Sequence, residues 1–427
     1  MRITYAGGLN ENEGTDINEC QEGQNFELML GDTDFKPRPP QDLKGTATLG
    51  GTIAGIMQMI TQDDTETTLI FEDDSSTPTI YTWDGSTTFT SKRTANLSVG
   101  SKLRDVYFSL DDTLSIFDIA KLTPLMKWDG TNLTRHLTSL DSGSGGSVSS
   151  ITRSGTTATV TTSGSHGLST GDLVIHAGAN ETDYNIEAEI TVTGAATYTY
   201  TVAGSPTTPA TGTITWSLGA EMFAKYGIVH NGRLWAFNVK VDSSDTPHLM
   251  VASAFEDIKT FDTTKRAGDS TFTTGNEAFY LLTPDLKPIN GVVEFNKQLI
   301  ISTEGGHLYR LAGYDSATYE WIDYHPGSAA IGDESLVNFG NDVAFMRRGG
   351  NIDTLRATDT SGDVSVDDIS RWIPDTVKDL TGAIAVYDEP RQKVFFFVSG
   401  KVLVLFKDIL YGTELSPWSV SHHRDEQ

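Results

Sequence analysis

A β-hairpin pattern that recurs at a nearly constant step constrains this chain more than any other feature. One copy has its turn at Phe295–Gln298 and the next has its turn at Phe339–Asp342, each between two apolar runs. The turn residues tolerate the left-handed backbone that a tight hairpin needs. Asn296 and Asn341 lie 45 residues apart, which is inside the roughly 40–50 residue period of propeller blades. The pattern predicts an all-β chain organised as a β-propeller.

The same step separates two Trp-Asp-Gly elements. Trp83–Gly85 and Trp128–Gly130 each end an apolar run in an Asp-Gly turn, and their tryptophans are 45 residues apart. Two such turns at blade spacing rarely arise independently. Further hairpin turns are expected at Asn231–Gly232 and at Asp388–Arg391. The repeat therefore predicts blades on both sides of the middle of the chain.

A different composition interrupts the repeat. Asp141–Ser147 is rich in Gly and Ser, which is typical of a flexible linker. The stretch that follows is rich in Thr, Gly and Ala, and its only basic residue is Arg153. Ala196–Val202 alternates apolar residues with threonine, as a half-buried antiparallel strand does. We expect a small β-sandwich inserted into a loop between blades, with a partial blade split around it.

The flanks of the chain carry weaker signals. Prolines within Lys36–Pro40 exclude a helix or a central strand, so we expect an extended arm that crosses the surface or a neighbouring subunit. Ile369–Leu380 contains Pro374 and has room for one short helix at most, and the tail from Trp418 is expected to fray. The predicted divisions are an N-terminal arm (1–52), the first part of the propeller (53–140), the inserted module (147–217), the remainder of the propeller (218–420) and a polar tail (421–427).

The formal net charge is −26, from 57 acidic and 31 basic residues. A surface of this sign repels nucleic acid and anionic membranes instead of holding them. The acidic clusters are expected to be solvated loops, and a lining that repels passing DNA is the alternative; they are Asp63–Asp64, Glu72–Asp74, Asp111–Asp112 and Asp367–Asp368. No apolar run is long enough for a membrane helix. The sole cysteine, Cys20, cannot form an internal disulfide.

No catalytic signature occurs in a convincing strand–turn–helix context. We therefore expect a protein that is not an enzyme, with no catalytic, cofactor-binding or metal-binding residues. The histidines His166, His176 and His422 fall in separate parts of the sequence, whereas a closed zinc site needs clustered ligands. Asp359–Asp368 offers oxygen atoms without the spacing of a calcium loop, and we interpret it as an acidic turn.

The two Trp-Asp-Gly turns allow a second interpretation. Glycoside hydrolysis uses two carboxylates around a sugar, but Asp84 and Asp129 precede glycines, where the turn alone selects aspartate. We favour a structural role for both. Trp83, Trp128 and Trp235 are candidates for a sugar-binding platform, although aromatic residues at repeat positions usually pack in a core.

Several segments of the sequence resemble one protein family. Gly7–Asn10, Lys36–Pro39, Glu277–Phe345 and Ser335–Thr358 resemble the tail nozzle proteins of short-tailed bacteriophages, which are also called tail tubular or hub proteins. The insert, Ile151–Trp216, resembles a small β-rich module found in phage tail proteins. The resemblance covers most of the chain outside the insert.

The resemblance implies a structural virion protein of the viral tail. Such a subunit forms a homo-oligomeric ring, six-fold by preference (a homohexamer), next to the portal and adaptor proteins, and it anchors tail fibres. It is assembled in the host cytoplasm, and double-stranded DNA passes through it during DNA ejection without specific binding. The alternative is a carbohydrate-binding or glycan-degrading propeller of a phage tail that recognises a receptor. A third possibility is a cellular adhesion or scaffold propeller.

Overall fold

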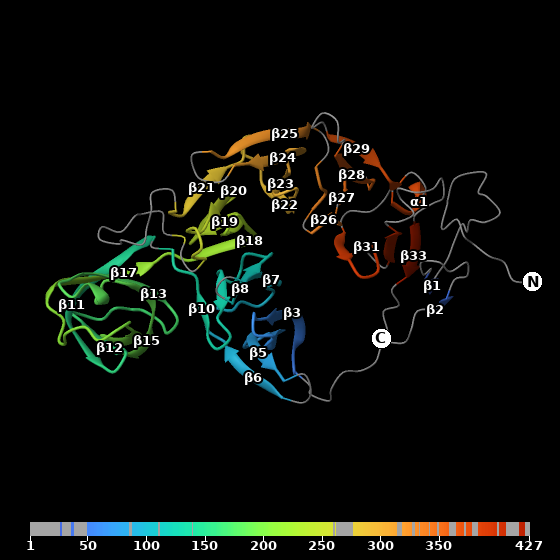
Figure 1. Ribbon diagram of the computed structural model, residues 1–427. Helices are drawn as coiled ribbons and strands as arrows, with labels where there is room; N and C mark the ends of the chain where they lie inside the picture. Colours follow the sequence, from blue (N-terminus) through green and yellow to red (C-terminus); the bar gives the residue numbers. More distant parts are fainter. Residues whose placement is uncertain are drawn as a thin grey trace, which may run out of the picture. The chain divides into compact units, whose positions relative to one another are not determined.

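The computed structural model (Figure 1) describes Phe26–Glu27, Lys36–Pro37 and residues 49–422 with gaps. The gaps are 85–87, 110–111, 139, 259–260, 262–275, 314–317, 327–328, 333, 341, 348–349, 358–363, 371–372, 378–382, 399–400 and 407–417. The expected arm, 1–52, therefore lies almost wholly outside the described residues. The chain divides into two compact units, each described by itself: unit A is Lys44–Thr283 with Asp315–Ala317, and unit B is Met1–Leu43, Pro284–Tyr314 and Thr318–Gln427.

Both units are built from blades, which are four-stranded antiparallel sheets whose strands follow one another in chain order. Unit A has three blades among its described residues. The first blade is β3 (Thr52–Ile60), β4 (Glu66–Asp73), β5 (Thr79–Trp83) and β6 (Phe89–Arg93); the second is β7 (Leu103–Phe108), β8 (Thr113–Asp118), β9 (Met126–Trp128) and β10 (Leu133–Arg135); the third is β18 (Met222–His230), β19 (Arg233–Val241), β20 (Ser244–Ala252) and β21 (Phe279–Leu282).

Unit B also has three blades among its described residues. The fourth blade is β22 (Ile289–Phe295), β23 (Gln298–Thr303), β24 (His307–Ala312) and β25 (Glu320–Pro326); the fifth is β26 (Leu336–Asn338), β27 (Val343–Met346), β28 (Ile352–Ala357) and β29 (Val364–Asp368); the sixth is β30 (Ile384–Asp388), β31 (Lys393–Val398), β32 (Lys401–Phe406) and β33 (Trp418–His422). The short strands β1 (Phe26–Glu27) and β2 (Lys36–Pro37) pair with each other. The helix α1 (Pro374–Val377) is a single turn, as the sequence predicts.

Turn residues define the blade hairpins. Between β18 and β19, Asn231 and Gly232 have φ of 50° and 68°; between β22 and β23, Asn296 and Lys297 have φ of 50° and 59°. Two successive positive φ angles make the turn whose twist matches that of the strands it joins. The hairpins predicted at these two places are confirmed.

Within each unit, apolar side chains fill the space between consecutive blades. In unit A, Met57 and Phe71 of the first blade pack with Ile116 and Trp128 of the second, and all four are almost completely buried. In unit B, two further clusters include Phe295, Ile300, Leu308, Val343 and Phe345, and then Met346, Ile352, Val394, Phe396 and Leu403. Burial at this scale stabilises by about 1.5–3 kcal/mol per large side chain.

The insert between the second and third blades forms a sheet of its own, drawn in green in Figure 1. Its elements are β11 (Asp141–Ser154), β12 (Thr157–Thr162), β13 (Leu173–Ala179), a short 3₁₀ turn (Thr182–Tyr184), β14 (Glu187–Glu189), β15 (Thr191–Gly194), β16 (Thr197–Thr201) and β17 (Gly212–Gly219). The first half of the long strand β11 pairs with β17 and its second half pairs with β12, so the sheet folds over a core that includes Val160, Val174, Tyr198 and Trp216. The protein is all-β, with β-propeller blades and an inserted small β-sandwich domain.

Three segments expected to be loops or tails are strands. Asp141–Ser147 is the first half of β11 and not a linker. Its glycines serve close packing, because a Cβ at Gly145 would lie 2.5 Å from the backbone oxygen of Trp216. Val364–Asp368, within the expected acidic turn, is β29, and Trp418–His422, in the expected frayed tail, is β33. Both are held by ladder pairing with the preceding strand of their blade.

Two further expectations are wrong. The insert does not split a blade, because β10 completes the second blade before it and β18 begins the third blade after it. Glu72 is not a solvated loop residue: it lies in β4, is 4% exposed, and its Oε1 accepts a hydrogen bond from the Gly51 backbone N–H.

Candidate functional site

The tryptophans considered as a sugar platform are largely inaccessible. Trp128 and Trp235 are 1% and 0% exposed, so neither ring is available to a glycan. Trp83 is half-buried, and its ring stacks on Phe89 with the centroids 6.4 Å apart. Tyr81 meets the same phenylalanine edge-on at 6.1 Å. Of the three tryptophans, Trp83 alone keeps a partly exposed ring, and it belongs to a small aromatic group.

The two turn aspartates bind their own hairpins. Asp84 Oδ1 accepts a hydrogen bond from the Thr88 backbone N–H at 3.0 Å. Asp129 Oδ1 accepts from the backbone N–H groups of Thr131 and Asn132 at 2.9 and 2.6 Å. Partial burial acts to raise the pKa of Asp129, but hydrogen bonds from Asn132 and Thr131 outweigh it and the pKa lies below its ordinary value. Each carboxylate therefore stabilises the turn in which it lies.

Two histidines of the insert, His166 and His176, pack against the same tyrosine, Tyr198. His176 is buried, its Nδ1–H donates to the Ile186 oxygen at 3.1 Å, and its Nε2 accepts from the Tyr198 hydroxyl at 3.0 Å. His166 packs edge-on against the same tyrosine at 5.4 Å, and its Nδ1 accepts from the Leu168 N–H. Burial lowers the pKa of His176 to about 4. This histidine is therefore a neutral hydrogen-bonding group of the core.

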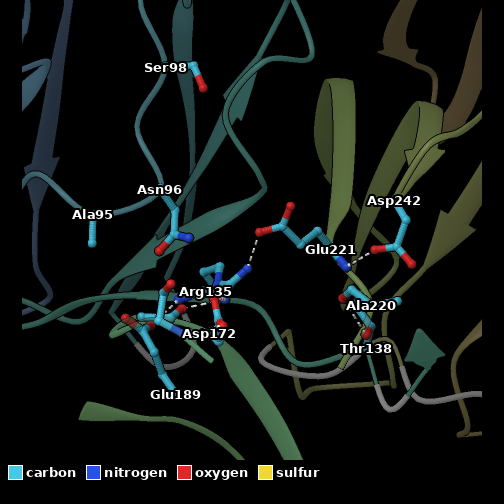
Figure 2. Close-up of polar contacts among 12 residues, drawn as sticks. Ala95, Asn96, Ser98, Arg135, Thr138, Asp172, Glu189, Ala220, Glu221 and Asp242 are labelled. Atoms are coloured by element: carbon cyan, nitrogen blue, oxygen red, sulfur yellow. Dashed lines mark hydrogen bonds and ion pairs between the residues drawn. The ribbon is translucent and has the colours of Figure 1, made fainter. Parts of the chain in front are cut away.

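A group of charged side chains, in which the arginines are buried and the carboxylates are partly exposed, joins the insert to the blades (Figure 2). Arg93 ends β6 and Arg135 ends β10, so the blade repeat places them at equivalent ends of successive blades. Their side chains are only 5% and 2% exposed. We call these two arginines, together with Asp172, Glu189 and Glu221, the insert clamp.

Each guanidinium nitrogen of Arg93 has an acceptor, and these acceptors lie on both sides of the junction. Its Nη1 lies 2.7 Å from Glu189 Oε1 of the insert and donates to the Leu133 oxygen at 2.9 Å. Its Nε donates to the Ala95 oxygen at 2.8 Å and its Nη2 to Asn96 Oδ1 at 2.9 Å. Burial lowers the pKa of Arg93, and the charge of Glu189 opposes that change. The ion pair thus offsets part of the cost of burying the guanidinium group.

Arg135 contacts the insert and the segment that leaves it. Its Nη2 donates to the Gly171 oxygen and lies 4.0 Å from Asp172 Oδ1. Its Nη1 lies 2.5 Å from Glu221 Oε1, and its backbone N–H donates to Glu189 Oε2 at 3.2 Å. Glu189 therefore bridges both arginines, and the outer strand β10 is capped by a carboxylate of the insert.

The clamp continues into the third blade, as Figure 2 shows for Glu221 and Asp242. The Glu221 N–H donates to Asp242 Oδ1 at 2.8 Å, and the Asp242 N–H donates to the Glu221 oxygen at 2.8 Å. At the base of the insert, the Ala220 N–H donates to the Leu140 oxygen at 2.7 Å. The two polypeptide connections of the insert are therefore adjacent and hydrogen-bonded.

Gly171 permits the close approach of the insert to the first blade. Its φ is 95°, and a Cβ there would lie 2.5 Å from Asn96 Oδ1 and 3.3 Å from Ala95 Cβ. A side chain at this position would be strained by the backbone and would displace the amide that Arg93 holds. Glycine is required at this contact for both reasons.

The chemistry of the clamp suits the joining of two domains. Its carboxylates face guanidinium groups, which is the arrangement of a buried ion-pair network. Among the described residues, no group of three or more His, Cys, Asp or Glu could hold a metal ion. In the same part of the chain, no helix has the length and hydropathy needed to cross a membrane.

The clamp was not predicted from the sequence, because its partners are far apart along the chain. Arg93 and Glu189 are separated by 96 positions, and Arg135 and Glu221 by 86. One signal was available. Arg93 and Arg135 end the fourth strands of the two blades that precede the insert, a stretch with a single basic residue, and buried arginines at such ends need acidic partners.

Comparisons with known proteins give distant likenesses. No protein-family model matches the chain, and no curated protein matches it. Among solved structures, the chain is similar to the computationally designed Ika8 protein (9% identity, 87% of this chain and 88% of that chain, TM-score 0.36). It is also similar to the endosialidase of phage phi92 (10% identity, 90% and 69%, TM-score 0.30) and to AztD from Citrobacter koseri (8%, 85% and 88%, TM-score 0.30). No functional conclusion follows from likenesses at this level.

Proposed function

We propose that this chain is a structural virion protein, a tail nozzle or hub subunit of a short-tailed bacteriophage that forms a ring, extends the DNA-ejection channel and anchors other tail parts. The observation that carries the proposal is the insert clamp. Two buried arginines contact the inserted domain through Glu189 and Asp172, and the segment that leaves it through Glu221. A domain fixed in this way has a defined orientation, which is what an assembly part needs in order to carry others.

The charge of the chain supports the same role. A net charge of −26 disfavours contact with phosphates, so DNA that passes along such a protein is not held by it. The resemblance of Glu277–Phe345 to tail nozzle proteins adds the expected partners, which are further copies of the chain in a six-fold ring, the portal and adaptor proteins, and tail fibres. The proposed role is non-enzymatic and belongs to the virion tail.

The test combines assembly and location. Native mass spectrometry of the purified chain, alone and with the adaptor protein of the same phage, is expected to show a closed ring of several copies. Immunogold labelling of phage particles is expected to place the chain at the tail. A chain that stays monomeric under both conditions and is absent from particles would contradict the proposal.

One observation favours the second candidate, a receptor-recognition propeller that binds carbohydrate. Tyr81, Trp83 and Phe89 form a half-buried aromatic group on the outer strands of the first blade, and aromatic faces are common sugar platforms. If this candidate is right, Trp83→Ala abolishes binding on a glycan array. The control is Trp321→Ala, which changes a half-buried tryptophan of unit B and should leave binding intact. No glycan binding by the parent chain would exclude it.

A further inference from the structure

A lysine, an asparagine and an aspartate meet between the second and third blades of unit A. Lys121 follows β8 of the second blade, whereas Asn238 is in β19 and Asp245 is in β20 of the third. Lys121 Nζ lies 2.6 Å from Asn238 Oδ1 and 2.6 Å from Asp245 Oδ1. The lysine side chain is 14% exposed and Asn238 is 5% exposed. The amine therefore sits against a buried amide with a carboxylate beside it.

The backbone at both Lys121 and Asn238 is held in an unusual conformation. Lys121 and Asn238 have φ of 53° and 55°, which is costly for residues other than glycine and tends to occur at functional positions. Asn238 lies at a β-bulge, where the register of β19 and β20 shifts between Phe237 and Val239. Bulges of this kind re-aim a side chain, and here the re-aimed side chain faces the lysine.

The loop that carries the lysine is fixed by Asp118. This carboxylate is 1% exposed and accepts hydrogen bonds from the backbone N–H groups of Ala120, Leu122 and Thr123 at 3.0, 2.8 and 2.8 Å. The Lys121 N–H donates to the Asp118 backbone oxygen at 2.9 Å. These hydrogen bonds hold the loop, so the amine is already positioned against the amide. Such positioning removes a large part of the barrier to an intramolecular reaction.

We propose that Lys121 and Asn238 form an intramolecular isopeptide bond, with Asp245 as the group that moves the proton. Asp245 takes a proton from the lysine ammonium, and the neutral Nζ attacks Asn238 Cγ to form the new C–N bond. The Cγ–Nδ2 bond then breaks. Nδ2 leaves as ammonia after taking one proton from Nζ, and the proton on Asp245 converts the ammonia to ammonium. The reactants and the products each contain one ammonium group and one amide, so no oxidant, reductant or cofactor is needed.

The hydrogen bond from Lys121 Nζ to Asn238 Oδ1 points to this reaction because it brings the amine next to the amide group that is attacked. Asp245 is 52% exposed, so the ammonium that forms beside it can leave into water. The product would join the second and third blades covalently across positions that are 117 residues apart in sequence. A protein that transmits force between domains gains resistance to blade separation from such a bond.

The experiment is mass analysis of the full chain with matched variants. The intact mass is expected to fall below the sequence mass by one ammonia. A tryptic digest is expected to contain Leu234–Lys240 joined to Asp105–Lys127, with Lys121 uncleaved. Lys121→Arg keeps the positive charge but removes the nucleophile, so it should restore the full mass, and the melting temperature should fall because the covalent link across 117 positions is lost. Asp245→Asn should slow bond formation about 100-fold or more, as loss of a general base does.

Ammonia loss alone is not diagnostic, because an Asn-Gly pair such as Asn231–Gly232 also releases ammonia when it cyclises. The joined peptide and its disappearance in Lys121→Arg distinguish the two. Full sequence mass in the parent chain after prolonged incubation, with trypsin cleaving after Lys121, would overturn the proposal and leave an ordinary ion pair.

Discussion

Single residues carry the blade repeat through their backbone preferences. Asn231 and Asn296 adopt the positive φ that the sequence requires of them, and Asp129 holds the turn that it begins. Such local chemistry is readable from a sequence because it depends on neighbours within three or four positions. Burial is not local. Glu72 looks like a surface acid in the sequence and is enclosed in the structure, because its environment comes from a distant segment, at Gly51.

The pH dependence of the insert is a prediction at the scale of one residue. Burial holds the pKa of His176 at about 4 in the folded state, against about 6.5 in an unfolded chain. The unfolded state therefore binds more protons between these values, and stability is lost as pH falls from about 6.5 to 4, by about 3 kcal/mol in total. His176→Gln removes this titration. Hydrogen exchange of the insert, corrected for intrinsic rates, should become less sensitive to pH over that window.

The control for this variant is the comparison above pH 7, where His176 is already neutral and the parent and variant should differ by a constant amount. An unchanged pH sensitivity in His176→Gln would show that other groups, such as the buried His136, control the acid response. Burial lowers the pKa of His136 well below its ordinary value, so it titrates in the same direction.

At the scale of the element, the junction between the insert and the blades shows the limit of sequence reasoning. Composition predicts a flexible linker at Asp141–Ser147, but the segment pairs with β17. The same glycines that suggest flexibility permit close contact, because Gly145 and Gly146 face the backbone and ring of Trp216. The insert itself was predictable from threonine alternation, whereas its attachment depends on side-chain pairs about 90 positions apart.

A glycine pair tests the clamp. Gly171 and Gly155 both have positive φ, 95° and 60°, but a Cβ at Gly155 meets nothing within 4 Å. Gly171→Ala should therefore cost more stability than Gly155→Ala, by about 1.5–3 kcal/mol, because it also disturbs the charged hydrogen bond from Arg135 to the Gly171 oxygen. Thermal unfolding and hydrogen exchange of β10 and β14 measure the difference. Equal losses in the two variants would mean that the clamp does not hold the insert.

At the scale of the whole molecule, the fold class follows from the sequence and the domain joint does not. A period of about 45 residues predicts propeller blades because each blade repeats the same local hairpins. The pairing of Arg93 with Glu189, and of Lys121 with Asn238, depends on which blades and loops become neighbours. No period in the sequence encodes those contacts.

Removal of the insert is the corresponding prediction. Deletion of residues 141–219, with Leu140 and Ala220 joined through Asn-Gly, should leave the blades folded, because these two residues are already hydrogen-bonded to each other. In this variant the deletion removes the acidic partners in the insert together with the burial, so Arg93 and Arg135 are exposed to water. Arg135→Ala in the complete chain should be more damaging, by about 1–3 kcal/mol, since it removes the donor to the Gly171 oxygen and leaves the partly exposed carboxylates of Asp172 and Glu221 without their partner. Chemical denaturation of both variants measures the two losses of stability. A larger loss in the deletion variant than in Arg135→Ala would contradict this account.

The adjacency of the two ends of the insert has a consequence for the order of folding. Asp141 pairs with Gly219 in one ladder, so the ends meet only when the insert has formed its sheet. Before that, the second and third blades are separated by a long loop whose closure carries an entropic penalty that grows with its length. Once the insert has folded, Leu140 and Ala220 at its two ends are hydrogen-bonded, so this loop is already closed. During synthesis from the N-terminus, we therefore expect the insert to fold before the third blade and to lower the entropic cost of bringing that blade to the second.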